Sequence, residues 1–394
     1  MHTPRRVAVT GIGVLGPCGI GRDAFWSGLL APAPAGEHRV PGFEPERYFA
    51  NPKETRRADR FTQLAVAAAE EALAQSGECR IDPERCGVLL GAGVGGLGTL
   101  EEQVWTFHEK GPRRVSPFLV PMMMANAAAA ALSMRHGFRG PCETTVTACA
   151  ASTHAIGNAA RLVATGRCDV VLAGGSEAAM TPVGMQGFAN MTALSPSGTS
   201  MPFAACRDGF IIAEGAGVVV LEDLEAARAR GATVVGEVLG SASTADAHHI
   251  TAPSPGGDGA VSCMEQALAD AGLVPDDIAQ INAHGTSTPR NDEAEAEAIA
   301  KVFGLPGPPV TSTKGVTGHA LGAAGALEVA AVLLSMHHRL IPPTAGTGGV
   351  DPALPQLDLV TGAPRPWAPG PTLSNSFGFG GHNGCVVLGP PPAP

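Results

Sequence analysis

Aromatic side chains and clustered positive charge are both scarce in this chain of 394 residues. Aromatic residues make up only 4% of it, so the hydrophobic core has to be packed mainly from small aliphatic side chains. The formal net charge is −10. Because binding to nucleic acid phosphates requires concentrated Lys and Arg, this charge argues against a nucleic-acid-binding protein.

Cysteine spacing typical of a metal or disulfide scaffold is also missing. The nine cysteines are irregularly placed, and no two of them form a C-x-x-C pair. The spacing of Cys and His therefore predicts no metal site. A reduced, cytoplasmic protein is the simplest interpretation.

Every long apolar run is interrupted. The run at 7–21 is rich in glycine and broken by proline, so we reject a secretory signal. The run at 117–134 has the length of a membrane span, but two prolines and Asn126 interrupt it, which favours a buried helix. We therefore expect no membrane association.

Short apolar runs, each followed by glycine and a helical pattern, recur instead along the chain. The strand-like runs lie at 5–11, 86–93, 144–149, 169–175, 215–223, 233–243, 278–285, 308–314 and 384–389. The clearest helical patterns lie at 61–77, 154–166 and 259–272. Near-continuous apolar strands that alternate with helices predict an α/β fold whose sheets are buried on both faces. Strand sets on both sides of about residue 235 are compatible with a duplicated fold, with halves at 1–235 and 236–394.

Two glycine patterns match a dinucleotide-binding turn. They are "GIGVLG" (11–16) and "GAGVGG" (91–96), each after a predicted strand. Neither is followed by a second strand that ends in an acidic residue, as that fingerprint requires. We interpret both as tight strand-to-helix turns. A nucleophile-elbow serine is absent as well, because "GGSEA" (174–178) is not G-x-S-x-G.

Cys149 lies in "VTACAAS" (146–152), where a predicted strand ends and a helix begins. A thiol at a helix N-terminus feels the positive end of the helix dipole and nearby amide N–H groups, which favour the thiolate. Such a placement suits a nucleophile. An isolated cysteine is nevertheless more often a buried core residue, so its surroundings decide between the two.

Two histidines lie at similar strand-to-loop transitions. His284 is in "NAHGTSTP" (282–289), and His319 is in "TSTKGVTGHALGAAGALE" (311–328). Both are flanked by glycine, and this placement suits residues that line a cleft. A third segment, "NSFGFGGHNG" (375–384), is so rich in glycine that its backbone amides can approach a ligand closely.

These four motifs, in this order, resemble those of the elongating β-ketoacyl-acyl carrier protein synthases, over about residues 5–389. The resemblance implies a thiolase-like fold, with duplicated βαβαβ halves in a five-layer αβαβα architecture. It also implies decarboxylative Claisen condensation in fatty acid or type II polyketide biosynthesis. Cys149 would take an acyl chain from a carrier protein, and a malonyl-carrier thioester would lose CO2 and attack it.

The resemblance implies a set of catalytic residues. They are Cys149, His284, His319, Lys314, Glu328 and Phe379. The two imidazoles would stabilise the enolate of decarboxylation, and the backbone N–H groups of the cysteine and the phenylalanine would hold the oxyanion of acyl transfer. The lysine and glutamate would organise the second histidine, and a purely structural ion pair is an equal alternative.

A second set would contact the substrate. Its members are Val94, Thr286, Thr288, Phe377, Gly378 and Gly380. The threonines match positions that contact the pantetheine arm, and Phe379 matches a gate for the acyl chain, whereas Phe377 fits a core position better. Val94 stands where isoleucine is common, which predicts a somewhat roomier acyl pocket, with an ordinary core valine as the alternative.

Partners follow from the same resemblance. No cofactor or metal is expected, because the substrates are carried on the phosphopantetheine arm of acyl carrier protein. That carrier is acidic, so its dock should be basic. The candidate arginines are Arg56, Arg57, Arg60, Arg113 and Arg114. A homodimer is the expected assembly, and a heterodimer with a chain-length-factor-like subunit is compatible with the sequence.

Several positions depart from the common pattern. Met201 and Ala204 replace charged groups in "MPFAAC", and His382 replaces a threonine in the glycine segment. These departures leave the acyl substrate and the pathway open. A thiolase-type acyl-CoA acyltransferase is the alternative enzyme, but it needs a second catalytic cysteine, and Cys385 lies just past the loop. A non-condensing chain-length-factor-like subunit would lack Cys149.

Overall fold

The computed structural model describes residues 4–77, 81–346 and 349–392. The strands up to residue 223 are β1 (Val7–Gly16), β2 (Gly19–Ile20), β3 (Cys86–Gly91), β4 (Cys142–Thr145), β5 (Val170–Glu177) and β6 (Gly215–Asp223). The later strands are β7 (Gly236–Ala245), β8 (Gln280–Asn282), β9 (Val310–Thr311), β10 (Leu340–Ile341), β11 (Arg365–Pro366), β12 (Thr372–Gly378) and β13 (His382–Gly389).

One strand order occurs twice in the central sheet. The order is β4-β3-β5-β6-β1-β7-β13-β12-β8-β9, with β2 paired to β1. Within each half, the five strands of this order can be numbered one to five as they occur along the chain, leaving out β2, β10 and β11. Counted outward from the junction of β1 and β7, both halves then have the order one, five, four, two, three. The inner pairs are antiparallel and the outer pairs are parallel in both halves. The described chain is thus a duplicated unit divided between Asp223 and Gly236, whereas a boundary at residue 235 stays a prediction.

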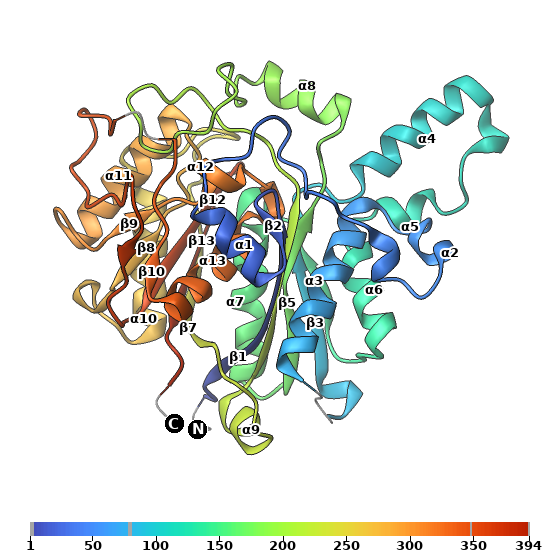
Figure 1. Cartoon of the computed structure of the whole chain (residues 1–394), viewed down its shortest axis with the longest axis horizontal. Helices are drawn as coiled ribbons and strands as arrows, with labels where there is room; N and C mark the ends of the chain where they lie inside the picture. The colour runs from blue at the N-terminus through green and yellow to red at the C-terminus, as the bar shows by residue number, and fades with distance from the viewer. Residues whose placement is uncertain (1–3, 78–80, 347–348, 393–394) are drawn as a thin grey trace.

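Helices cover both faces of each half (Figure 1). They are α1 (Arg22–Leu29), α2 (Pro52–Thr55), α3 (Arg60–Ser76), α4 (Leu97–Lys110), α5 (Leu119–Met123), α6 (Ala127–His136), α7 (Ala151–Ala164), α8 (Pro182–Asn190), α9 (Leu224–Ala229), α10 (Asp258–Ala271), α11 (Pro289–Phe303), α12 (Lys314–Thr317) and α13 (Ala324–His338). Helices α7 and α13 contact strands of both halves, α3 and α6 cover the outer face of the first half, and α10 covers that of the second. The result is the predicted five-layer αβαβα arrangement.

Small residues set the spacing between these layers. Helix α3 packs on β1 so closely that a Cβ atom at Gly13 would lie 1.8 Å from the carbonyl oxygen of Ala68. At Gly11 the same atom would lie 2.1 Å from the carbonyl oxygen of Ala72. Backbone therefore rests directly on backbone, which explains how a chain poor in aromatic residues fills its interior.

Two expectations about local structure were wrong. The strand predicted at 144–149 ends at Thr145, and Cys149 lies in a 3-10 turn, Ala148–Ala150, before α7. The run at 117–134 breaks into α5 and α6, and Met134 is 78% exposed, so it is not one buried helix. The glycine-rich segment 375–384 contains the end of β12 and the start of β13.

One segment of the described chain, Leu321–His338, is long and apolar enough to cross a membrane by length and composition. Of this stretch, 89% is buried inside the protein. Its helix, α13, lies in the middle layer between the two halves of the sheet (Figure 1). The segment is therefore explained as the core helix of a globular fold.

The close packing of β1 on α3 predicts the effect of a single methyl group. Gly13→Ala places that methyl against backbone that cannot move aside, so unfolding should become about 3 kcal/mol easier. Urea denaturation measures the change. Gly187→Ala in α8 is the matched control, because nothing lies within 4 Å of its Cβ position and alanine favours the helix. Equal stabilities of the two variants would contradict the packing described here.

Candidate active site

Cys149 lies at the base of a cavity of about 560 Å³. The preceding residue, Ala148, has a left-handed backbone with φ 49°, which turns the chain sharply between β4 and α7. The cysteine itself is 7% exposed. Neighbouring strands and helices thus hold a single thiol at the bottom of a large, open cavity.

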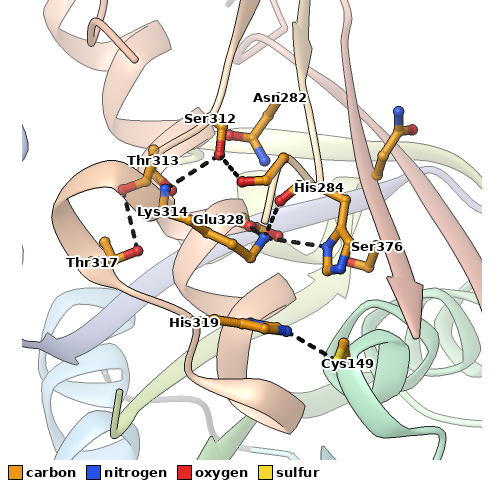
Figure 2. Close-up of polar contacts among 12 residues, drawn as sticks. Cys149, Asn282, His284, Ser312, Thr313, Lys314, Thr317, His319, Glu328 and Ser376 are labelled. Carbon is orange, nitrogen blue, oxygen red and sulfur yellow. Dashed lines mark hydrogen bonds and ion pairs between the residues drawn. The ribbon is translucent and has the colours of Figure 1, made fainter. Parts of the chain in front are cut away.

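Two histidines from the second half meet this thiol. Figure 2 shows His319 pointing at Cys149, with 3.0 Å between Nε2 and Sγ. The ring of His284 stands edge-on to that of His319, with ring centres 5.4 Å apart. His284 follows β8, and His319 follows α12. The three side chains that the sequence singled out therefore converge, although they come from different halves of the chain.

A buried lysine fixes the tautomer of His284. Nζ of Lys314 forms an ion pair with Glu328, donates to the carbonyl of His284 at 2.6 Å, and lies 3.2 Å from Nδ1 of the same histidine (Figure 2). An ammonium group can only donate hydrogen bonds, so Nδ1 accepts and Nε2 carries the ring proton. The pair thus contacts the first histidine, where the resemblance pointed to the second.

Burial makes both imidazoles neutral. It lowers the pKa of His284 and of His319 well below 6.5, and the nearby charge of Lys314 acts in the same direction. Burial also raises the pKa of Glu328 to about 7, against the opposing effect of the lysine. The working state of the site therefore contains two neutral rings beside one buried ion pair.

The thiol is protonated at rest, contrary to the expectation from its position before a helix. Burial raises the pKa of Cys149 to about 11. The charge of Lys314 and the N–H groups of Phe379 and Cys149 lower this pKa, but they do not outweigh burial. A base must therefore take the proton, and the neutral His319 is in contact with it.

The glycine-rich hairpin formed by β12 and β13 packs directly on the 3-10 turn that holds Cys149. A Cβ atom at Gly378 would lie 3.0 Å from the backbone nitrogen of Cys149. The N–H groups of Phe379 and of Cys149 both act on the sulfur. Two backbone donors thus lie where an oxyanion would form beside the sulfur.

Most of the predicted substrate residues line the cavity. Thr286 and Thr288 do so, with their hydroxyl oxygens 2.9 Å apart, and Phe377, Gly378 and Phe379 line it as well. The next residue, Gly380, is not among the lining residues, and its N–H donates to the carbonyl of Ile250 at 2.7 Å.

Val94 lies outside this cavity. It is 44% exposed, in the loop between β3 and α4. The end of β3, just before this loop, nevertheless touches the helix of the nucleophile, because a Cβ atom at Gly91 would lie 2.3 Å from the backbone carbon of Ala151. A role for Val94 in acyl-chain length therefore stays a prediction.

Four of the five candidate docking arginines are exposed. Arg57 lies over the ring of Phe118, 4.4 Å from its centre, and Arg56, Arg113 and Arg114 also face solvent. Arg60 differs, because it forms two hydrogen bonds of 2.6 and 2.8 Å with the buried carboxylate of Glu214. Its charge is thus engaged within the protein.

The unusual residues noted in the sequence are not among the residues that line the cavity. Met201 is partly buried, with its sulfur 3.7 Å from that of Cys206. Ala204 is fully buried. His382 begins β13, and a Cβ atom at Gly380 would lie 3.1 Å from its ring. His382 therefore packs against the glycine loop that carries Phe379.

Two buried glutamates of the site were not identified from the sequence. Glu295 accepts the backbone N–H groups of His284 and Gly285, both at 2.7 Å. Glu177 accepts those of Gly93 at 2.5 Å and Gly322 at 3.2 Å, so it joins loops of both halves. Burial raises the pKa of each to about 7. An acid at the end of a strand-like run was a usable signal for Glu177, whereas Glu295 is one of several acids on its helix.

The thiol and two imidazoles also satisfy the distance criterion for a metal site, since their ligand atoms lie within 4.8 Å of one another. The chemistry of the donors is less suitable. A metal ligand must offer a lone pair, but Lys314 leaves the proton of His284 on Nε2. The ammonium charge beside this ring also repels a cation. The arrangement favours nucleophilic and hydrogen-bond catalysis.

The chain was compared with known families and structures. Residues 32–227 match the family model "Beta-ketoacyl synthase, N-terminal domain", and residues 235–347 match "Beta-ketoacyl synthase, C-terminal domain". The 3-oxoacyl-[acyl-carrier-protein] synthase 2 of Synechocystis sp. is 43% identical over 96% of each chain.

Two solved structures have the same fold over nearly their whole length. The ishigamide ketosynthase/chain length factor has a TM-score of 0.92 at 32% identity, covering 99% of this chain and 100% of the other. A type II PKS acyl-carrier protein in complex with its ketosynthase bound to the hexaketide has a TM-score of 0.88 at 31% identity, with the same coverage.

The protonated thiol predicts how Cys149 reacts with a small neutral alkylating agent. With a pKa of about 11, only roughly one thiol in ten thousand is ionised at pH 7. The alkylation rate should therefore rise about tenfold for each pH unit between pH 7 and 10. Peptide mass spectrometry follows the Cys149 peptide, and the exposed Cys206 reports on the reagent in the same digest. A plateau below pH 8 would contradict a burial-dominated pKa.

The buried ion pair predicts a double-mutant cycle. Lys314→Met leaves Glu328 without its partner and should destabilise the fold by about 3 kcal/mol, whereas adding Glu328→Gln should restore part of that loss. Urea denaturation at pH 6 and pH 9 measures both variants.

The pKa of the Glu328 carboxyl group determines whether stability rises or falls with pH. Because burial raises the pKa of Glu328 to about 7, the folded state holds this proton more tightly than the unfolded state. Its contribution to stability therefore falls as pH rises from about 5 to 7. Losing Lys314 removes an effect that lowers this pKa, so the single variant should lose more stability towards pH 9 than its parent. Parallel pH curves would refute this.

Proposed function

The chain belongs to the β-ketoacyl synthase family, and we propose that Cys149 is the nucleophile that carries the acyl chain in its condensation reaction. The enzyme is an acyltransferase of the 3-oxoacyl-[acyl-carrier-protein] synthase type. The observation that carries the residue assignment is the 3.0 Å contact between the buried thiol and the neutral imidazole of His319, with the fixed donor of His284 beside it.

Acyl transfer comes first. The thiol proton of Cys149 passes to Nε2 of His319, and the sulfur attacks the thioester carbonyl of an acyl-carrier substrate. The negative charge on the carbonyl oxygen is held by the N–H groups of Cys149 and Phe379. The bond to the carrier's sulfur then breaks, and this sulfur leaves with the proton, which returns His319 to its neutral form.

Condensation follows when a malonyl-carrier thioester occupies the cavity. Loss of CO2 leaves an electron pair that is delocalised onto the thioester oxygen as an enolate. His284 donates to that oxygen through Nε2, whose proton Lys314 keeps in place, and His319 adds a second donor once its ring proton has moved from Nδ1 to Nε2. The carbanion attacks the carbonyl carbon of the acyl-cysteine, the bond from this carbon to the sulfur breaks, and Cys149 leaves as a thiolate that takes up a proton from solvent. The product is a 3-ketoacyl thioester two carbons longer.

The carrier delivers both substrates on its pantetheine arm. A cavity of about 560 Å³ with Thr286 and Thr288 in its wall suits an amide-containing arm of this kind. Since decarboxylation itself supplies the carbanion, the reaction needs no further cofactor. The exposed arginines Arg56, Arg57, Arg113 and Arg114 are the proposed dock for the acidic carrier.

A second copy of the chain is the proposed partner at one face. Helix α4 stands away from the body of the protein (Figure 1), with Trp105 63% exposed and Phe107 49% exposed. Strand β4, at one end of the described sheet, exposes Cys142 and Glu143. An exposed apolar helix and an exposed strand at the end of a sheet are each suited to pairing with an equivalent surface. A chain-length-factor-like subunit is the alternative partner, since one similar structure combines a ketosynthase with such a factor.

Fatty acid elongation is the proposed pathway, because the similar curated enzyme is a 3-oxoacyl-[acyl-carrier-protein] synthase 2. Polyketide elongation is the second candidate, which the likeness to the ketosynthase of a type II PKS favours. A cytoplasmic location is proposed, in line with free thiols at all eight cysteines of the described residues.

Intact-mass analysis tests the assignment of the nucleophile. Incubation with an acyl-carrier donor should add one acyl group to Cys149 and none to a Cys149→Ala variant. Release of CO2 from the malonyl-carrier substrate should fall at least a hundredfold in His284→Ala, which loses the fixed donor. His319→Ala should slow both acylation and CO2 release. Acylation elsewhere, or normal CO2 release in both histidine variants, would overturn these roles.

Val94→Ile tests the proposed role of this position in acyl-chain length. One added methylene should shorten the preferred acyl primer, and kcat/KM for the longest accepted primer should fall severalfold. Profiling with primers of increasing length measures the preference. Val274→Ile, at an exposed site distant in the sequence and outside the cavity lining, is the control. An unchanged preference would remove Val94 from the substrate-binding set.

A further inference from the structure

His154 has no role in the reaction described above, yet it lies on α7 one turn after the nucleophile. Its side chain is buried, with 8% exposed. Nδ1 lies 2.8 Å from the hydroxyl oxygen of Thr147, and Nε2 lies 2.9 Å from the backbone carbonyl of Asn383. The ring therefore bridges a residue of the first half and a residue of the second.

The partners of the ring decide its tautomer. A backbone carbonyl can only accept, so Nε2 carries the proton and donates to Asn383. Nδ1 then has a free lone pair and accepts from the hydroxyl of Thr147. Burial lowers the pKa of His154, in agreement with a neutral ring that uses one donor and one acceptor.

The first end of the bridge holds the turn of the nucleophile. Thr147 is the residue just before the 3-10 turn that carries Cys149, and its carbonyl accepts the N–H of Ala150 at 3.1 Å. The residue between them, Ala148, has the left-handed backbone noted above. Fixing the side chain of Thr147 therefore fixes the direction of the N–H group of Cys149.

The second end holds the base of the glycine hairpin. Asn383 lies in β13 opposite Phe377 of β12, so it closes the hairpin whose tip carries Phe379. Its side-chain amide donates to Asp246 at 2.7 Å. Fixing the carbonyl of Asn383 therefore fixes the strand from which the loop of Phe379 extends.

Two glycines allow the bridge to be this short. A Cβ atom at Gly384 would lie 2.9 Å from the ring of His154. At Gly378 it would lie 2.9 Å from the carbonyl oxygen of Thr147. Side chains at these positions would push the hairpin away from both the ring and the turn.

We propose that His154 is a positioning residue that keeps the two oxyanion donors, the N–H groups of Cys149 and Phe379, at a fixed separation. These donors belong to different halves of the chain, and His154 hydrogen-bonds to both segments that carry them. This inference rests on the proposed function, because it concerns the acyl-transfer step. It assigns His154 no contact with the substrate.

Two substitutions separate the two ends of the bridge. In His154→Asn, the amide oxygen can accept near the place of Nδ1, so this variant keeps the hydrogen bond to Thr147 and loses the one to Asn383. In His154→Gln, the amide nitrogen can donate near the place of Nε2, so this variant keeps the hydrogen bond to Asn383 and loses the one to Thr147. Both should slow acyl transfer to Cys149 about tenfold, since a small displacement of a reacting group is costly. The KM for the acyl-carrier donor should stay within about twofold.

Thr147 supplies the matched control. Thr147→Val removes the hydroxyl and should match His154→Gln in rate, whereas Thr147→Ser keeps it and should retain the native rate. The double variant with His154→Gln and Thr147→Val should be no slower than either single variant, because both lose the same hydrogen bond.

Chemical rescue gives a further readout. The ring of His154 borders a second cavity of about 160 Å³, whose lining includes the exposed Asn158 and Arg161. In His154→Ala, added imidazole should enter this space and restore much of the acyl-transfer rate, while N-methylimidazole, which lacks the N–H donor, should not.

Release of CO2 from the malonyl-carrier substrate without a primer distinguishes positioning from general damage. This step uses His284 and His319, so it should stay within about twofold of native in every His154 and Thr147 variant. Equal slowing of both steps together with a lowered Tm would overturn the proposal, as would native acyl transfer in these variants. If the native protein itself fails to acylate Cys149, the proposed function is wrong instead.

Discussion

The active site depends on the direct packing of α7 against α13 between the two halves of the sheet. A Cβ atom at Gly325 of α13 would lie 2.0 Å from the hydroxyl of Thr153 on α7. At Gly322, just before α13, it would lie 2.1 Å from the nitrogen of Gly93. Only glycine permits this approach, and the approach brings a thiol from one half within hydrogen-bond reach of a histidine from the other.

Burial determines the chemistry of the groups that this packing brings together. It keeps the thiol of Cys149 protonated and both imidazoles neutral. The buried cation Lys314 is balanced by Glu328 and directs the tautomer of His284. The site therefore has fixed hydrogen-bond donors and a neutral base at rest, and apart from the ion pair of Lys314 and Glu328, charge develops only when a substrate reacts.

The sequence predicted the fold well and singled out three side chains that the structure brings together, for identifiable reasons. Apolar runs followed by glycine marked most of the strands, and β6 was predicted with its observed bounds. Cys149, His284 and His319 stand in short, distinctive motifs, the two histidines beside glycine, and the structure brings the three side chains together. Glu295 has no such motif, because it is one of several acids on α11, and only contact with the backbone of His284 distinguishes it.

The sequence by itself determined which reactive residues exist, their order, and the alternation of strands and helices, because these depend on residue type and local spacing. The tertiary structure decided the protonation of Cys149, the contact of Lys314 with the first histidine, and the bridge through His154. These properties depend on burial and on contacts between residues far apart in the chain, such as the 229 positions that separate His154 from Asn383. Neither burial nor contacts between distant residues can be read from the local sequence.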